Sequence, residues 1–113
     1  MTLEELREQI DVLDRQLVVL LSRRAETALE AGRLKVSTDL PIYEPAREKV
    51  IYENVRKANQ GPLPDLELTH IFERIIDVMR TLQSNELASK RNAQAAALGH
   101  EAGAETPGTG SRQ

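Results

Sequence analysis

Residues 2–35, TLEELREQIDVLDRQLVVLLSRRAETALEAGRLK, decide the fold of this chain. Thr2 followed by Glu5 is a capping-box pattern, which is typical of a helix start. No Gly or Pro interrupts the segment before Gly32. Apolar residues alternate spacings of three and four along it, as in a helix that packs on other helices. These residues are Leu3, Leu6, Ile10, Leu13, Leu17 and Leu20. We therefore predict one long helix from about residue 3 to about residue 35.

Two further helices are predicted downstream, each preceded by a loop that contains proline. Pro45 suits the first turn of a second helix, which ends at the turn Asn59-Gln60-Gly61-Pro62. Pro64-Asp65 opens a third helix with its own apolar stripe. That stripe comprises Leu68, Phe72, Ile75, Ile76, Met79 and Leu82. Because no segment alternates in the manner of a strand, the predicted fold class is all-α, with three helices in the chain.

The chain is predicted to divide into a helical domain over residues 1–92 and a tail over residues 93–113. From Gly99 onward the sequence holds four of the six glycines and no large apolar residue. Such a segment cannot bury enough apolar surface to fold, so we predict that the tail is disordered.

The length of the first helix predicts the assembly. At 1.5 Å per residue this helix extends roughly 50 Å, whereas a compact domain of this size has a diameter of only about 35 Å. One chain cannot cover the leucine stripe of so long a helix. An isologous homodimer in which two chains intertwine is the commonest solution. A plain coiled-coil or helix-bundle interaction module shares all of these features and is the alternative.

Composition excludes several classes of function. The 113 residues include no cysteine and only two histidines, so a thiolate nucleophile is excluded and no metal site is predicted. A net charge of -3 with interspersed signs argues against nucleic acid as a partner. No run approaches the roughly 18 apolar residues that cross a bilayer. The N-terminal residues do not resemble a secretory signal, so we expect a cytoplasmic protein without membrane contact.

Polar residues interrupt the apolar stripe of the first helix. The series continues to Arg24, then to the small residues Ala28 and Ala31, and then to Lys35. A buried guanidinium without a partner costs several kcal/mol. We therefore expect an anion between the two cations, with the alanines leaving room for it. An internal salt bridge, or long side chains that reach back to solvent, are the structural alternatives.

The other two helices each turn one polar residue inward. The stripe of the second helix arrives at Glu48, beside Arg47, and that of the third arrives at Gln83. A solvated first turn would explain the Arg47-Glu48 pair, and an ordinary interhelical hydrogen bond would explain Gln83. Taken together, the three helices predict one interior pocket with an excess of cations. Such a pocket suits a small polyanion that carries a hydroxyl group.

Three segments resemble, in order and spacing, the all-helical (type II) class of chorismate mutases. They are LREQIDVLDRQLVVLLSRRAETALEAGRLK, PIYEPAREKVIYENV and IFERIIDVMRTLQ, and the similarity covers roughly residues 3–88. The most diagnostic elements are the Leu-Leu-x-x-Arg run that ends at Arg24, the Gly32-x-x-Lys35 step and the Arg47-Glu48 pair. The resemblance implies an isomerase that converts chorismate to prephenate in phenylalanine and tyrosine biosynthesis, without a cofactor or metal ion.

The resemblance also implies how the substrate is held. Arg24 and Arg47 correspond to arginines that bind its carboxylates within one subunit. Arg7 corresponds to an arginine that the partner's first helix donates to a shared site. Arg7 lies about 100° around the helix from Arg24, so the two cannot easily serve one pocket from one chain.

The remaining roles concern the reacting end of the substrate. Lys35 and Gln83 correspond to the two donors to its ether oxygen, and Glu48 to the acceptor of its ring hydroxyl. Glu44 falls where relatives commonly carry Asp, at the hydroxyl end. Met79 stands where some bacterial relatives have a small polar residue, so it is left out of the predicted site. These residue types suit a concerted rearrangement that needs charge placement and restraint, with no nucleophile or general base.

Two other functions share most of these features. Isochorismate pyruvate lyase resembles this fold and shares most of the cationic site. Glu48 is the discriminator, because those lyases lack a carboxylate at the corresponding place. A noncatalytic, mutase-like regulatory module would instead act on a partner enzyme of the aromatic pathway. The presence of all the polar residues of the site favours the mutase.

Overall fold

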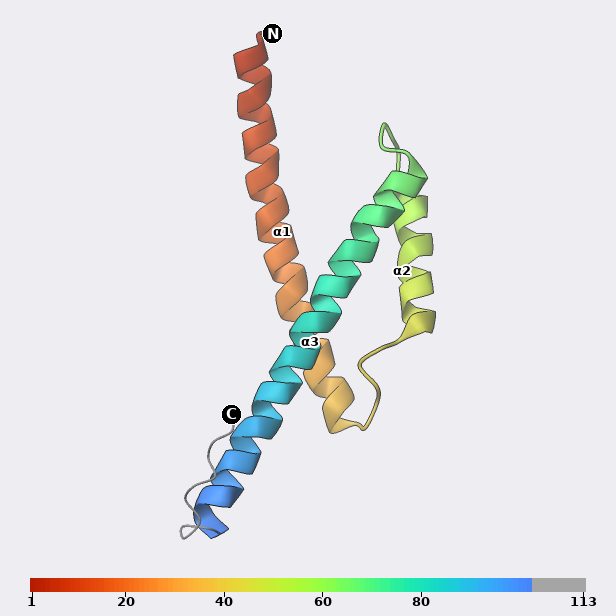
Figure 1. The fold of residues 1–113 in the computed structure, drawn as a ribbon. Helices are drawn as coiled ribbons and strands as arrows, with labels where there is room; N and C mark the ends of the chain where they lie inside the picture. The colour runs from red at the N-terminus through yellow and green to blue at the C-terminus, as the bar shows by residue number, and fades with distance from the viewer. Residues whose placement is uncertain (103–113) are drawn as a thin grey trace.

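A computed structural model describes the backbone of residues 1–102 and the side chains of residues 1–98. It contains three helices in the predicted order (Figure 1): α1 spans Leu3–Ser37, α2 spans Pro45–Ala58 and α3 spans Asp65–Ala102. No strand occurs in these 102 residues. The all-α prediction is therefore confirmed. Within the same residues, no helix is long and apolar enough to cross a membrane.

The capping box at the start of α1 forms as predicted. The Thr2 hydroxyl oxygen accepts a hydrogen bond from the Glu5 backbone N–H at 3.1 Å, and the Glu5 carboxylate accepts one from the Thr2 N–H at 2.9 Å. Two N–H groups that would otherwise lack partners at the helix start are thereby satisfied. The helix runs to Ser37, two residues past its predicted end, and the Thr38 N–H then bonds to the Leu34 carbonyl at 3.0 Å.

Proline and asparagine set the boundaries of α2. Pro45 occupies the first turn, where its missing N–H is not needed. At the other end the Asn59 side-chain amide donates to the Leu63 carbonyl at 2.8 Å and to the Asp65 carboxylate at 2.7 Å. Its oxygen accepts from the Gly61 N–H at 3.0 Å, and Gly61 adopts a φ of 79°, which glycine tolerates without strain. This turn directs α3 back alongside α2.

The third helix continues past the predicted domain boundary. The prediction of a disordered tail from residue 93 is wrong for residues 93–102, which extend α3. Alanine is the strongest helix former, and four of the six residues 93–98 are alanine. A helix already nucleated at Asp65 therefore propagates through them at little further cost. The rest of the predicted tail, residues 103–113, lies outside the described residues.

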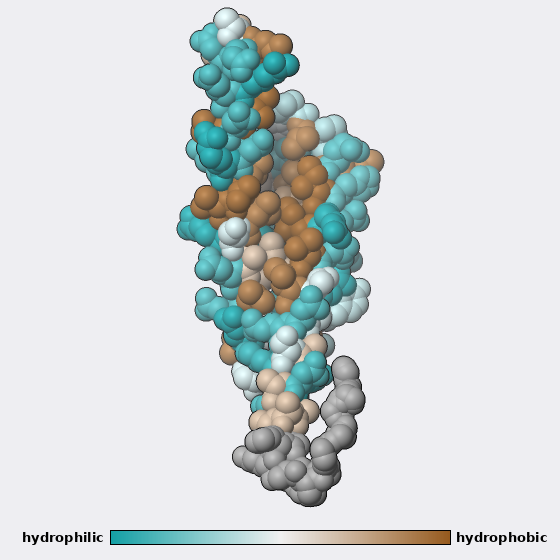
Figure 2. Space-filling model, turned by 60° about the vertical axis from the view of Figure 1, so that its left-hand side comes forward, coloured by the Kyte–Doolittle hydropathy of each residue, from teal (hydrophilic) through white to brown (hydrophobic). Residues whose placement is uncertain are grey.

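The helices leave a large apolar surface of α1 without cover. The α1 helix crosses α3, and α2 packs along α3, while the N-terminal part of α1 extends away from both (Figure 1). All six residues of the predicted α1 stripe are at least 44% exposed, and Figure 2 shows apolar side chains gathered along this face of the molecule. The radius of gyration is 20.7 Å, against about 13 Å for a compact chain of this length.

Candidate active site

A cavity of about 310 Å³ lies where α1, α2, α3 and the loop between α1 and α2 face one another. This volume falls at the lower end of the range for small-molecule sites, about 300–1,000 Å³. Its lining combines aliphatic side chains with a group of charged and amide side chains. The polar members of the lining are Arg24, Thr27, Lys35, Glu44, Arg47, Glu48, Arg80 and Gln83.

The α1 wall carries both of the cations that interrupt its apolar stripe. Arg24 and Lys35 line the cavity, and Ala28 and Ala31 lie on the wall between them. Their short side chains leave the space open. Burial and, to a smaller extent, the nearby Arg47 guanidinium lower the pKa of Arg24. Two guanidinium groups therefore face the same cavity and repel one another, which favours an anion between them.

Lys35 is held against the loop that precedes α2. Its ammonium group donates to the Ile42 carbonyl at 3.0 Å and pairs with the Glu44 carboxylate at 2.7 Å. The sequence prediction put Glu44 at the hydroxyl end of the site, and in the structure its carboxylate pairs with Lys35. Because an ammonium has three N–H donors, one remains for a ligand.

Gln83 lies at the closest approach of α1 and α3. The side chain is only 9% exposed, and its amide nitrogen donates to the Ala28 carbonyl at 2.6 Å. A Cβ atom placed on Gly32 would lie 2.8 Å from Gln83 Cγ, so only glycine allows the two helices to cross at this distance. The amide nitrogen carries two hydrogens, and the second is left for a ligand. Gly32 belongs to the Gly32-x-x-Lys35 step, one of the elements that carry the family resemblance.

The first turn of α2 contributes Arg47 and Glu48 to the cavity. Glu48 is 20% exposed, and its carboxylate lies 3.5 Å from the guanidinium of Arg80. Arg47 and Arg24 differ from the other cations of the site. Within the described part of the chain, no carboxylate oxygen lies within 4.0 Å of either guanidinium. These two arginines are therefore available to an anionic ligand.

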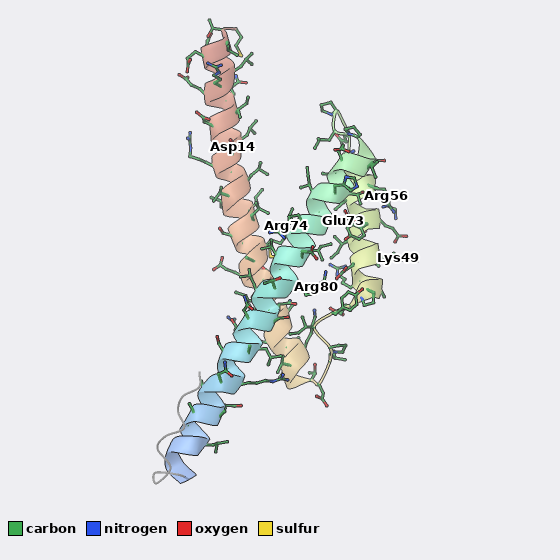
Figure 3. All side chains as sticks on the ribbon, in the orientation of Figure 1. Asp14, Lys49, Arg56, Glu73, Arg74 and Arg80 are labelled. Atoms are coloured by element: carbon green, nitrogen blue, oxygen red, sulfur yellow. The ribbon has the colours of Figure 1, made fainter. Side chains whose placement is uncertain are left out.

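Met79 and Arg80 are among the lining residues that were absent from the predicted site. Met79 is buried beside Gln83 and lines the cavity, although the prediction left it out. Arg80 also lines the cavity, and Figure 3 shows it on α3, on the side that faces α2. A charged residue beside an apolar stripe is usually part of a solvated face, so the pattern gave no signal for Arg80. Its position four residues after the buried Ile76 places it next to the interior.

Arg7 lies outside this cavity. It is exposed near the start of α1, where its guanidinium lies 4.0 Å from Glu4 in the preceding turn. Along the helix axis it stands about 25 Å from Arg24. The structure thus brings together six of the seven predicted site residues, and the seventh, Arg7, does not line the cavity.

The electrostatics of the cavity favour a dianion. Four cationic side chains and two carboxylates line it, which leaves a net charge of +2. Two arginines are available for anionic groups, an ammonium and an amide each keep a spare N–H, and a carboxylate can accept from a hydroxyl. Residues 6–84 match the family described as Chorismate mutase type II. The chain belongs to the chorismate mutase type II family.

Curated relatives agree with this family. The chain is 36% identical over 85 residues to a bifunctional chorismate mutase/prephenate dehydratase of Aquifex aeolicus, and the match covers 72% of this chain but 24% of that protein. The chain thus spans about a quarter of the length of such bifunctional relatives. It is also 31% identical to the chorismate mutase of Methanocaldococcus jannaschii, with 80% of this chain and 92% of the relative covered.

Solved structures of chorismate mutases share the fold. The Helicobacter pylori chorismate mutase in complex with prephenate superposes with a TM-score of 0.70 at 35% identity, covering 76% of this chain and 93% of that one. The form II structure from Thermus thermophilus gives the same TM-score at 32% identity, covering 72% and 92%. The crossed arrangement of three helices is therefore the arrangement of this family.

Proposed function

We propose that this chain is a chorismate mutase, an isomerase that rearranges chorismate to prephenate. The observation that carries the proposal is the pair Arg24 and Arg47, two guanidinium groups that face one cavity of net charge +2 without a carboxylate partner among the described residues. Chorismate is a dianion of matching charge. The cavity is in the size range of small-molecule sites. Its lining also offers groups that can bind the two carboxylates and the ring hydroxyl of chorismate.

The two arginines would hold the substrate in its reactive conformation. A planar guanidinium fork binds a carboxylate through two parallel hydrogen bonds, which fixes orientation as well as position. Holding the enolpyruvyl side chain over the ring brings the two carbon atoms that form the new bond together. The binding energy thereby offsets, before the reaction starts, part of the entropic cost of reaching the transition state.

Lys35 and Gln83 would stabilise the charge that grows on the ether oxygen as the carbon-oxygen bond breaks. Each is already anchored, Lys35 by Glu44 and Ile42 and Gln83 by Ala28, and each keeps one N–H free. Donors that need no reorganisation supply about 3 to 4 kcal/mol each. An acceleration of about 10⁶ requires roughly 8 kcal/mol, so two donors with conformational restraint are sufficient. We assign Glu44 to holding Lys35 and Glu48 to accepting the ring hydroxyl.

A second copy of the chain would complete the site. The exposed α1 stripe needs cover, and Arg7 is too far from Arg24 to reach the cavity of its own chain. We therefore infer an intertwined homodimer in which Arg7 of each chain reaches the other chain's substrate. In the bifunctional relatives a chorismate mutase and a prephenate dehydratase are one protein. That fusion supports a partner enzyme of the aromatic pathway for this chain.

The test is a direct assay. The purified chain is incubated with chorismate and, separately, with isochorismate, and the loss of substrate absorbance is followed. We expect prephenate from chorismate and no release of pyruvate from isochorismate. Arg24→Met should lower kcat/KM at least about a hundredfold, because it removes the cation that would pair with a substrate carboxylate in a partly buried site. Arg91→Met, the same change at an exposed position of α3, is the matched control.

Two results would contradict the proposal. One is a folded, dimeric protein that leaves chorismate unchanged. The other is release of pyruvate from isochorismate at a comparable rate, which would assign the chain to the lyases.

A further inference from the structure

Arg80 connects three separate segments of the chain at one end of the cavity. Its guanidinium donates to Asp77 at 2.8 Å, one turn earlier on α3. It lies 3.5 Å from the Glu48 carboxylate of α2 and 4.8 Å from the ring centroid of Tyr43, in the loop before α2. A cation over an aromatic ring at this distance is attracted by the negative face of the ring. The side chain is 32% exposed. The three contacts restrict the positions that its guanidinium can adopt.

The loop between α1 and α2 is consequently fixed from both sides. Lys35 of α1 binds Ile42 and Glu44, while Arg80 of α3 covers Tyr43 between them. Three consecutive loop residues are thus in contact with two different helices. Since Glu48 follows this loop by one turn of α2, its carboxylate is positioned by the same set of contacts.

Glu48 needs such a fixed partner because of the charges around it. Arg24 and Arg47 line the same cavity and have no carboxylate partner within the described residues. A Glu48 carboxylate without a fixed partner would pair with one of these arginines and compete with the substrate for it. Arg80 supplies a cation that already has Asp77 as a second partner. Pairing Glu48 with Arg80 therefore leaves Arg24 and Arg47 open.

The surroundings of Tyr52 show which charge dominates this region. Burial raises the pKa of Tyr52, and the nearby carboxylates of Glu48, Glu73 and Asp77 raise it further, while Arg80 alone lowers it. A group of carboxylates thus surrounds this end of the interface between α2 and α3. Arg80 is the cation whose charge opposes theirs at Tyr52.

We propose that Arg80 is a positioning residue that holds Glu48 by one carboxylate oxygen, so that the other oxygen accepts the ring hydroxyl of the substrate. The inference rests on the proposed function, since it explains how the acceptor of that hydroxyl is oriented. In this role Arg80 itself does not bind the substrate carboxylates. Removing it should impair the rate more than substrate binding.

A double-mutant cycle tests the inference. Arg80→Met should lower kcat about tenfold with a smaller change in KM, and Arg80→Lys, which keeps a cation near Glu48, should recover most of that loss. In a Glu48→Gln background the Arg80→Met change should have almost no further effect, because a neutral amide needs no cation. Arg91→Met on the same helix is the matched control and should match the wild-type chain.

The alternatives give different results. If Arg80 instead bound a substrate carboxylate, Arg80→Met would raise KM by the same factor in both backgrounds, and the inference would be overturned. Equal kcat for Arg80→Met and the wild-type chain would overturn it as well. If Arg80→Met does not fold, judged by circular dichroism, Asp77→Asn replaces it and should lower kcat about two- to threefold. An inactive wild-type chain would instead count against the proposed function.

Discussion

The site depends on one residue that has no side chain. Gly32 is the only residue of α1 that is buried in the described chain, and it is buried by Gln83. Glycine within a helix costs about 1 kcal/mol relative to alanine. That cost is offset here by the close crossing, which brings the amide of Gln83 to the Ala28 carbonyl and into the cavity.

Gly32→Ala should therefore lower activity without unfolding the chain. The added methyl group would lie 2.8 Å from Gln83 Cγ and 3.2 Å from its Cβ, and neither atom is the free end of the side chain. Helix propensity favours alanine by about 1 kcal/mol, and overpacking opposes it by about 1–3 kcal/mol. We expect a change of only a few degrees in Tm and a fall of about tenfold in kcat, measured with chorismate.

The same change in a Gln83→Ala background serves as the control. There the Cγ atom is gone, so Gly32→Ala should cost little further activity. A wild-type kcat for the single Gly32→Ala variant would show that the close crossing does not position Gln83.

At the scale of elements, the sequence predicts helices better than it predicts their ends. The capping box at Thr2 and the proline at Pro45 identified two helix starts, because each uses a local hydrogen-bonding or steric rule. The end of α3 was missed by ten residues, because an alanine-rich segment has high helix propensity but no apolar stripe.

The candidate site was predictable wherever a polar residue replaced an apolar one. Arg24, Glu48 and Gln83 each interrupt a stripe, and all three line the cavity. Arg80 was not predictable in this way, because it interrupts no stripe. Its role follows from tertiary contacts with Tyr43 and Glu48, which belong to other segments. The partner of Glu44 depended likewise on the path of a loop.

One ion pair connects α1 to α3 beyond the crossing. The Arg33 guanidinium makes two hydrogen bonds to the Glu86 carboxylate, at 2.8 and 2.9 Å. The hydrogen bond from Arg33 is the largest of the influences that lower the pKa of Glu86 below its ordinary value of 4.5. A carboxyl group whose pKa is lowered by folding stabilises the fold at pH values above that ordinary pKa. The contribution is lost as the pH falls through the lowered pKa.

Glu86→Gln should accordingly be less stable than the wild-type chain at neutral pH, and the difference should shrink as the pH falls below 4.5. The measurement is the free energy of unfolding by urea across a pH series, at one protein concentration because a dimer is expected. Glu53→Gln, at an exposed position of α2, provides the control. A difference that is constant across pH would show that the carboxylate charge of Glu86 does not contribute.

At the scale of the whole molecule, the extended shape supports the proposed homodimer. The radius of gyration is 20.7 Å and the leucine stripe on α1 is uncovered, whereas a compact monomer of this length has a radius of gyration of about 13 Å. Arg7 lies on the same uncovered part of α1, about 25 Å from Arg24. A two-fold arrangement would cover both stripes and carry each Arg7 toward the other chain's cavity.

Hybrid dimers test this arrangement. Arg7→Ala and Arg24→Ala should each be nearly inactive alone, because every site lacks one arginine. In a mixed dimer, one site combines the intact Arg24 of one chain with the intact Arg7 of the other. Random exchange of equal amounts makes half of the dimers mixed, each with one intact site, so about a quarter of the wild-type activity should return. Mixing Arg24→Ala with Arg47→Ala is the control and should recover nothing, since both residues serve the cavity of their own chain. With subunit exchange verified by native mass spectrometry, no recovery in the first mixture would place Arg7 outside the site.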